Sequence, residues 1–66
     1  MDQGRDPIAV GQTAYDERLS RLGEVMEVLG TLVALRPLGG GREWNAERRH
    51  VRPATAMEKM RPGVAE

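Results

Sequence analysis

The segment from Leu22 to Trp44, LGEVMEVLGTLVALRPLGGGREW, contains two isolated glycines that constrain the fold more than any other feature. A glycine inside a helix costs about 1 kcal/mol relative to alanine, so Gly23 and Gly30 both disfavour a continuous helix here. In an extended chain each has a use. Gly30 suits a tight reversal that needs positive φ, and Gly23 suits a point where another backbone passes closely. Glycine placement, together with several β-branched residues, therefore favours short strands.

Hydrophobic periodicity indicates the opposite. Five apolar residues fall at the spacing of a helical stripe: Leu19, Leu22, Met26, Leu29 and Val33. Such a stripe predicts a helical hairpin or coiled-coil dimer built on residues 15–35. The residues by themselves leave both folds open.

The order and spacing of five short motifs resemble small actinobacterial proteins with an SH3-like β-barrel, related in pattern to Tudor and KOW modules. The motifs are VGQTAYD (10–16), LGEVMEV (22–28), LVALRP (32–37), GGGREW (39–44) and VRPA (51–54). The resemblance implies an all-β fold, a small SH3-like barrel of about five short antiparallel strands. Proteins of this kind are largely uncharacterised, so the resemblance implies a fold rather than a role. The polar stretch NAERRH departs from the β-rich strand of such barrels, so residues 45–52 stay open between a strand and a helical turn.

A chain of 66 residues allows one domain. We expect a flexible N-terminal tail over residues 1–9, the barrel over 10–55, and a C-terminal tail or short helical turn over 56–66. We expect both tails to be disordered. The predicted core consists of Val10, Tyr15, Leu22, Val25, Val28, Val33, Leu35, Trp44 and Val51.

The sequence offers little chemistry. It has no cysteine and one histidine, His50, so we expect no metal site, and no cofactor-binding or catalytic constellation is recognisable. The N-terminal stretch is acidic and broken by Pro7, unlike a signal peptide, and no apolar run reaches the ~20 residues of a membrane span. We therefore expect a cytoplasmic, non-enzymatic protein that does not associate with membranes.

Two kinds of binding remain. The first is protein–protein interaction, with an unknown partner or a second copy, through a groove between residues 15–21 and 36–44. Surplus apolar side chains would serve it: Leu19, Leu29 and Leu38. The alternative is weak nucleic-acid binding through an arginine-rich face. That face would be made of Arg36, Arg42, Arg48, Arg49 and Arg52.

Overall fold

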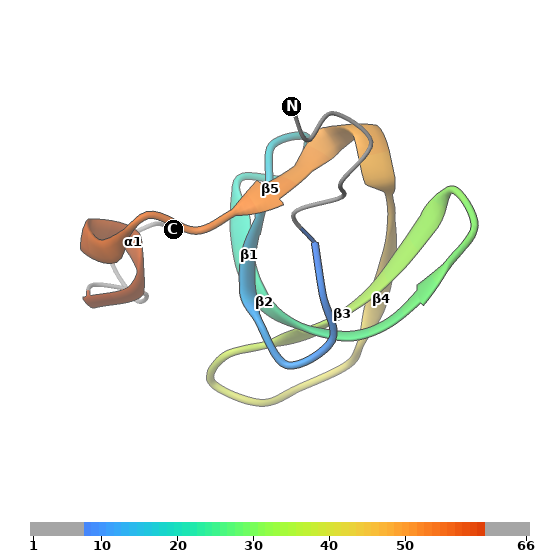
Figure 1. Ribbon diagram of the computed structural model, residues 1–66. Coiled ribbons are helices and arrows are strands. Elements are labelled where there is room, and N and C mark those ends of the chain that lie inside the picture. Colours follow the sequence, from blue (N-terminus) through green and yellow to red (C-terminus); the bar gives the residue numbers. More distant parts are fainter. Residues whose placement is uncertain (1–7, 61–66) are drawn as a thin grey trace, which may run out of the picture.

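The computed structural model describes residues 8–60, which form a five-stranded antiparallel sheet followed by a short helix (Figure 1). The strands are β1 (Thr13–Asp16), β2 (Arg21–Leu29), β3 (Leu32–Pro37), β4 (Trp44–Glu47) and β5 (Val51–Pro53). A 3₁₀ turn, η1 (Arg48–His50), joins β4 to β5, and the helix α1 is Ala56–Met60. The predicted all-β fold is confirmed. The helical alternative over residues 15–35 is wrong, because strands occupy that segment.

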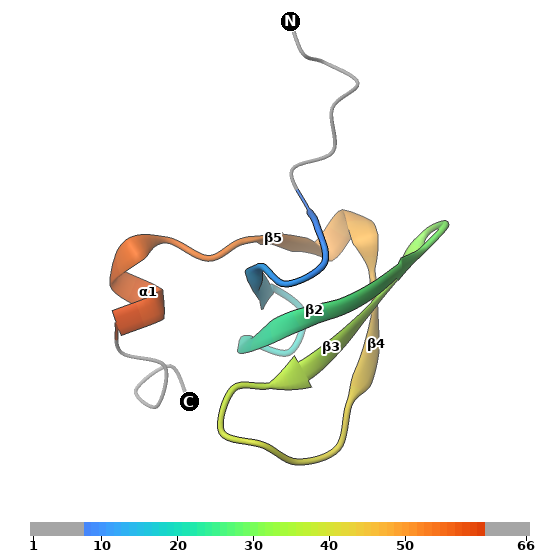
Figure 2. The ribbon, with the colours of Figure 1, turned by 60° about the horizontal axis from the view of Figure 1, so that its bottom comes forward.

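The order of the strands in the sheet is β4-β3-β2-β1-β5. Four consecutive strands are neighbours, and β5 returns to lie beside β1. The sheet curls on itself (Figures 1 and 2), but in the described part of the chain no ladder joins β4 to β5. Over the described residues the sheet is therefore not closed into a barrel, and β4 and β5 are its two edges.

Gly23 and Gly30 both lie at positions where a larger residue would be strained or crowded. Gly30 has φ +60° in the two-residue turn between β2 and β3, where Leu29 and Leu32 are paired. Gly23 lies inside β2, and a Cβ there would be 2.9 Å from Cη2 of Trp44 and 3.0 Å from the carbonyl oxygen of Arg36. The glycines therefore mark a turn and a close approach, as predicted.

The strand β2, which carries Leu22, Met26 and Leu29 of the predicted helical stripe, does not keep a regular period of two. The pairing of β2 with β3 shifts register between Val25 and Glu27, a β-bulge. Because a bulge adds one residue, the strand's inward side chains fall at Val25 and then Val28, three positions apart instead of two. Val28 packs against the core beside fully buried Val25. A strand with a bulge thus imitates part of the spacing of a helix.

The core consists of seven buried residues, with Val28 and Trp44 packed against it. The seven are Ile8, Ala14, Val25, Val33, Leu35, Ala46 and Val51. Three predicted members differ in place: Leu22 is buried outside this cluster, Tyr15, its cross-strand partner, is half-buried, and Val10 is exposed.

The predicted burial of Val10 is wrong. Val10 is 66% exposed, whereas Ile8, which was expected in the N-terminal tail, is buried. The N–H of Gln12 donates to the carbonyl of Ala9, so Val10 and Gly11 are the central residues of a β-turn, and Gly11 has φ +91°. The turn holds Val10 outward, and β1 begins only at Thr13.

The segment left open between strand and helical turn contains both, as β4, η1 and the start of β5. The C-terminal helical turn is present as α1. Of the predicted tails 1–9 and 56–66, residues 1–7 and 61–66 lie outside the described residues.

Candidate functional site

The two edges of the sheet differ in the backbone groups that they leave unpaired. On β5, the pairing with β1 directs the polar groups of Val51 and Pro53 away from the sheet. Pro53 has no N–H, its carbonyl accepts from Arg52 Nη1 (3.2 Å), and the N–H of Val51 donates to the carbonyl of Arg48. The β5 edge therefore offers little to another strand.

The β4 edge is open. The N–H of Arg48 donates to the carbonyl of Thr31 (2.8 Å), in register with the β3–β4 ladder. Hydrogen-bonded pairs alternate in an antiparallel ladder, so the N–H and C=O groups of Asn45 and Glu47 point away from β3. The Glu47 carbonyl is taken up by the first bond of η1. Within residues 8–60 the N–H and C=O of Asn45 and the N–H of Glu47 have no hydrogen-bond partner.

A groove of about 180 Å³ runs beside this edge. It is lined by Asp16, Arg18, Leu19, Leu32, Asn45, Ala46, Glu47 and His50. Pockets for drug-sized molecules are typically about 300–1,000 Å³, so this groove fits a single side chain rather than a whole ligand. Leu19 and Leu32, which are 54% and 40% exposed, are its apolar walls.

A wider hollow of about 580 Å³ adjoins the groove at Glu47. Among the described residues it is lined by Thr31, Glu47, Arg48 and Arg49. Its charged groups already have partners. Arg49 Nε pairs with Glu47 Oε1 (2.9 Å), and Arg48 Nη1 donates to the carbonyl of Gly30 (2.9 Å). This hollow offers no set of converging polar groups that would orient a small ligand.

The loop that carries Leu19 is held by a buried carboxylate. Asp16 is 2% exposed, and its Oδ1 accepts from the N–H groups of Arg18 (2.9 Å) and Leu19 (3.3 Å). Its Oδ2 accepts from Nε1 of Trp44 (2.8 Å), the first residue of β4. The guanidinium of Arg21 lies 4.4 Å from the centroid of the Trp44 ring. The side chain of Asp16 thus connects the β1–β2 loop, which carries Leu19, to β4, and both segments line the groove.

The structure brings together part of the predicted leucine set. Leu19 lines the groove, and Leu29 is the cross-strand partner of Leu32, which lines it too. Leu38 lies in the β3–β4 loop and does not line the groove. Sequence reasoning missed Leu32, although the alternation of β3 could have found it. Val33 and Leu35 face inward, so Leu32 must face outward.

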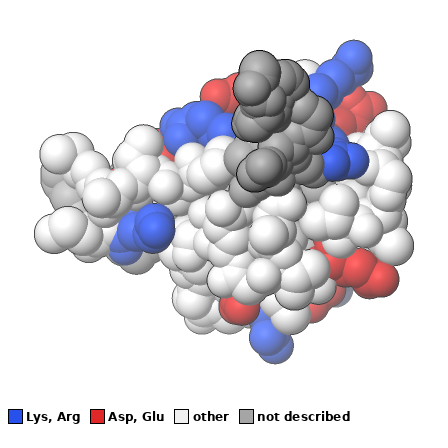
Figure 3. Space-filling model, in the orientation of Figure 1, with Lys and Arg blue, Asp and Glu red and all other residues white. Residues whose placement is uncertain are grey.

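The five predicted arginines do not form one face. They come from β3 (Arg36), the β3–β4 loop (Arg42), η1 (Arg48 and Arg49) and β5 (Arg52). In the sheet order, β1 and β2 separate β3 from β5. On the face shown in Figure 3, basic side chains lie at separate places with acidic ones between them.

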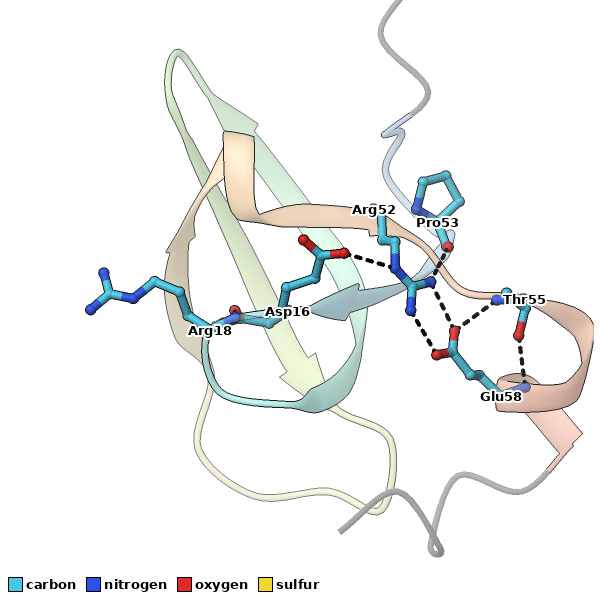
Figure 4. A network of polar contacts seen from close by, with 7 residues as sticks. Asp16, Arg18, Arg52, Pro53, Thr55 and Glu58 are labelled. Carbon is cyan, nitrogen blue, oxygen red and sulfur yellow. Dashed lines mark hydrogen bonds and ion pairs between the residues drawn. The ribbon is translucent and has the colours of Figure 1, made fainter.

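Arg52 is enclosed by acceptors. Its guanidinium donates to both carboxylate oxygens of Glu58 (3.0 and 2.8 Å), to Oε2 of Glu17 (3.1 Å) and to the Pro53 carbonyl (Figure 4). It also lies 4.6 Å from the ring centroid of Tyr15. The hydrogen bond from Arg52, followed by the one from the Thr55 backbone, lowers the pKa of Glu58 to about 2. Arg52 thus acts as a clasp that links α1 to the sheet, with its side chain 37% exposed.

Thr55 and Glu58 begin α1 as a capping box. Thr55 Oγ1 accepts from the N–H of Glu58 (3.1 Å), and Glu58 Oε1 accepts from the N–H of Thr55 (2.9 Å). The pattern Thr-x-x-Glu is visible in the sequence and could have predicted this helix start.

Between Ile8 and Met60 no group of three or more histidine or acidic side chains could hold a metal ion. No helix in that range is long and apolar enough to cross a membrane. Comparisons with protein-family models, curated proteins and solved structures found no match. The geometry of the β4 edge is therefore the basis for a functional hypothesis.

Proposed function

We propose that the protein is a non-enzymatic interaction module that binds an extended segment of a partner protein along the free edge of β4. The observation that carries this proposal is the row of unpaired backbone groups on Asn45 and Glu47, beside a groove with apolar walls. In this mode the partner's main chain supplies affinity through strand pairing, and one side chain in the groove supplies specificity.

Three features support the β4 edge over the rest of the surface. The N–H and C=O of Asn45 and the N–H of Glu47 are unpaired, whereas on β5 the Val51 N–H and the Pro53 carbonyl are occupied and Pro53 has no N–H. The groove beside β4 has the volume of one side chain. The Asp16–Trp44 bond fixes the groove wall before a partner arrives, which lowers the entropic cost of binding.

The proposal is tested with random ten-residue peptides displayed on phage and selected on the immobilised full chain. Selected peptides are then titrated into ¹⁵N-labelled protein. We expect dissociation constants below about 1 mM and shifts centred on the amides of Asn45, Ala46 and Glu47.

Two variants locate the site chemically. Asn45→Pro removes an outward N–H without removing a bond of the β3–β4 ladder, and Asn45→Ala keeps that N–H. Binding should fall at least tenfold for the proline variant and stay nearly unchanged for the alanine variant, with thermal melts confirming that both fold.

The apolar wall has an equally close control. Leu32 and Leu38 are each 40% exposed, but only Leu32 lines the groove. Leu32→Ser should weaken binding and Leu38→Ser should not. Selection that yields no binding peptide, or peptides that shift other amides and bind Asn45→Pro as tightly as wild type, would overturn the proposal. So would a chain whose β4 edge is already occupied by a second copy at the concentrations used.

A further inference from the structure

We infer that the segment bound by the β4 edge is acidic, with an apolar anchor residue flanked by aspartate or glutamate. This inference rests on the proposed function and deepens it by naming the chemistry of the partner. It comes from the state of the charged groups around the groove.

Arg18 is the charged group of the groove that is left uncompensated. It lies in the β1–β2 loop, is exposed, and lines the groove next to Leu19. Only its backbone N–H is engaged, by Asp16, and its guanidinium has no partner within the described range 8–60. In Figure 4 the side chain extends away from the Arg52 network.

The acidic groups of the groove are already satisfied. The carboxylate of Asp16 is buried and accepts three N–H donors, so it presents almost no surface to a bound peptide. Glu47 pairs with Arg49 at 2.9 Å, and His50 Nε2 lies 3.5 Å from the same oxygen. The side chain of Arg49 is 77% exposed, against 46% for Glu47.

The balance of exposed charge at the groove is therefore basic. Among the described lining residues, Arg18 and Glu47 carry the exposed charges, and Glu47 is already paired with Arg49 of the adjoining hollow, so the uncompensated charge is that of Arg18. A partner carboxylate placed near Arg18 can form an ion pair with its guanidinium without breaking an existing ion pair of the protein. A partner lysine there meets repulsion instead, which provides selectivity against basic segments.

The experiment uses the tightest peptide from the phage selection, resynthesised in three versions whose residues flanking the apolar anchor are all Glu, all Gln or all Lys. Each is titrated into the ¹⁵N-labelled full chain at 20 mM and 500 mM NaCl. Exposed ion pairs are weak, so the Glu version should bind about two- to fivefold more tightly than the Gln version at low salt, and the Lys version most weakly. The differences should shrink at high salt.

A matched pair of variants assigns the effect. Arg18→Gln should abolish the difference between the Glu and Gln versions, whereas Arg42→Gln removes the same charge from the β3–β4 loop and should leave it intact. If the three versions bind the β4 edge equally, or if Arg42→Gln acts like Arg18→Gln, this inference is wrong while the proposed function stands. If no version shifts the amides of Asn45 and Glu47, the proposed function fails and this inference fails with it.

Discussion

Replacing Gly23 with alanine should destabilise the fold because of one crowded contact. The added Cβ would lie 2.9 Å from Cη2 of Trp44, 3.0 Å from the carbonyl oxygen of Arg36 and 3.2 Å from Cβ of Leu35. Carbon atoms in contact normally stand about 3.5–4.0 Å apart. The Arg36 oxygen belongs to the β3 backbone, and the Trp44 ring is fixed by its bond to Asp16, so neither yields freely.

Overpacking of this kind costs about 1–3 kcal/mol. Loss of glycine from the unfolded chain returns about 0.4–1 kcal/mol. The net destabilisation expected for Gly23→Ala is therefore about 1–2 kcal/mol, which in a domain of this size lowers Tm by roughly 4–16 °C.

The assay is thermal unfolding followed by circular dichroism, with Gly39→Ala as the control. A Cβ at Gly39 would meet nothing within 4 Å. The Gly39 variant should therefore be as stable as wild type or up to about 1 kcal/mol more stable, because only the unfolded-chain effect operates there. Equal melting temperatures for the two alanine variants would refute the packing of Trp44 against Gly23.

Three further predictions concern other parts of the fold. Trp44→Phe removes the indole donor from the buried carboxylate of Asp16 and should cost about 2 kcal/mol in urea unfolding; an unchanged midpoint would contradict that bond. Because Arg52 lowers the pKa of Glu58 to about 2, below its ordinary 4.5, the stabilisation of α1 should be complete above about pH 4.5 and lost as the pH falls toward 2. The amide shifts of α1 report this loss, and a helix that persists unchanged at pH 2 would refute the clasp. Ser20 has φ +55°, so Ser20→Val should be about 1 kcal/mol less stable than Ser20→Asn, and equal stabilities would contradict the left-handed conformation.

One turn and one strand followed from local sequence features, whereas the choice between strands and a helix over residues 15–35 did not. The turn at Gly30 and the bounds of β3 depend on conformational preferences within a few residues. The bulge after Val25 was not visible, because a bulge is defined by the register with a neighbouring strand. The burial of Ile8 was missed for a similar reason. A turn at Val10 and Gly11 separates it from β1, and only the folded chain shows where it packs.

The candidate site was only partly predictable. Leu19 and Leu29 stood out as surplus apolar groups, but their meeting with Leu32 depends on strand pairing. The identity of the open edge depends on the order of all five strands, which no single segment determines. The engagement of Arg52, one of the five predicted arginines, could not be predicted, because its pairing with Glu58, six residues away, becomes apparent only in three dimensions.

Amide hydrogen exchange along β4 tests the central claim, that this strand has an unpaired edge, without any partner. The N–H of Ala46 lies within the ladder to β3, whereas those of Asn45 and Glu47 point away from it. After correction for intrinsic rates, Asn45 and Glu47 should exchange at least tenfold faster than Ala46 in the free protein. They should become protected when a selected peptide is added. Equal protection of all three amides in the free chain would mean that the edge is already paired, and would contradict the account.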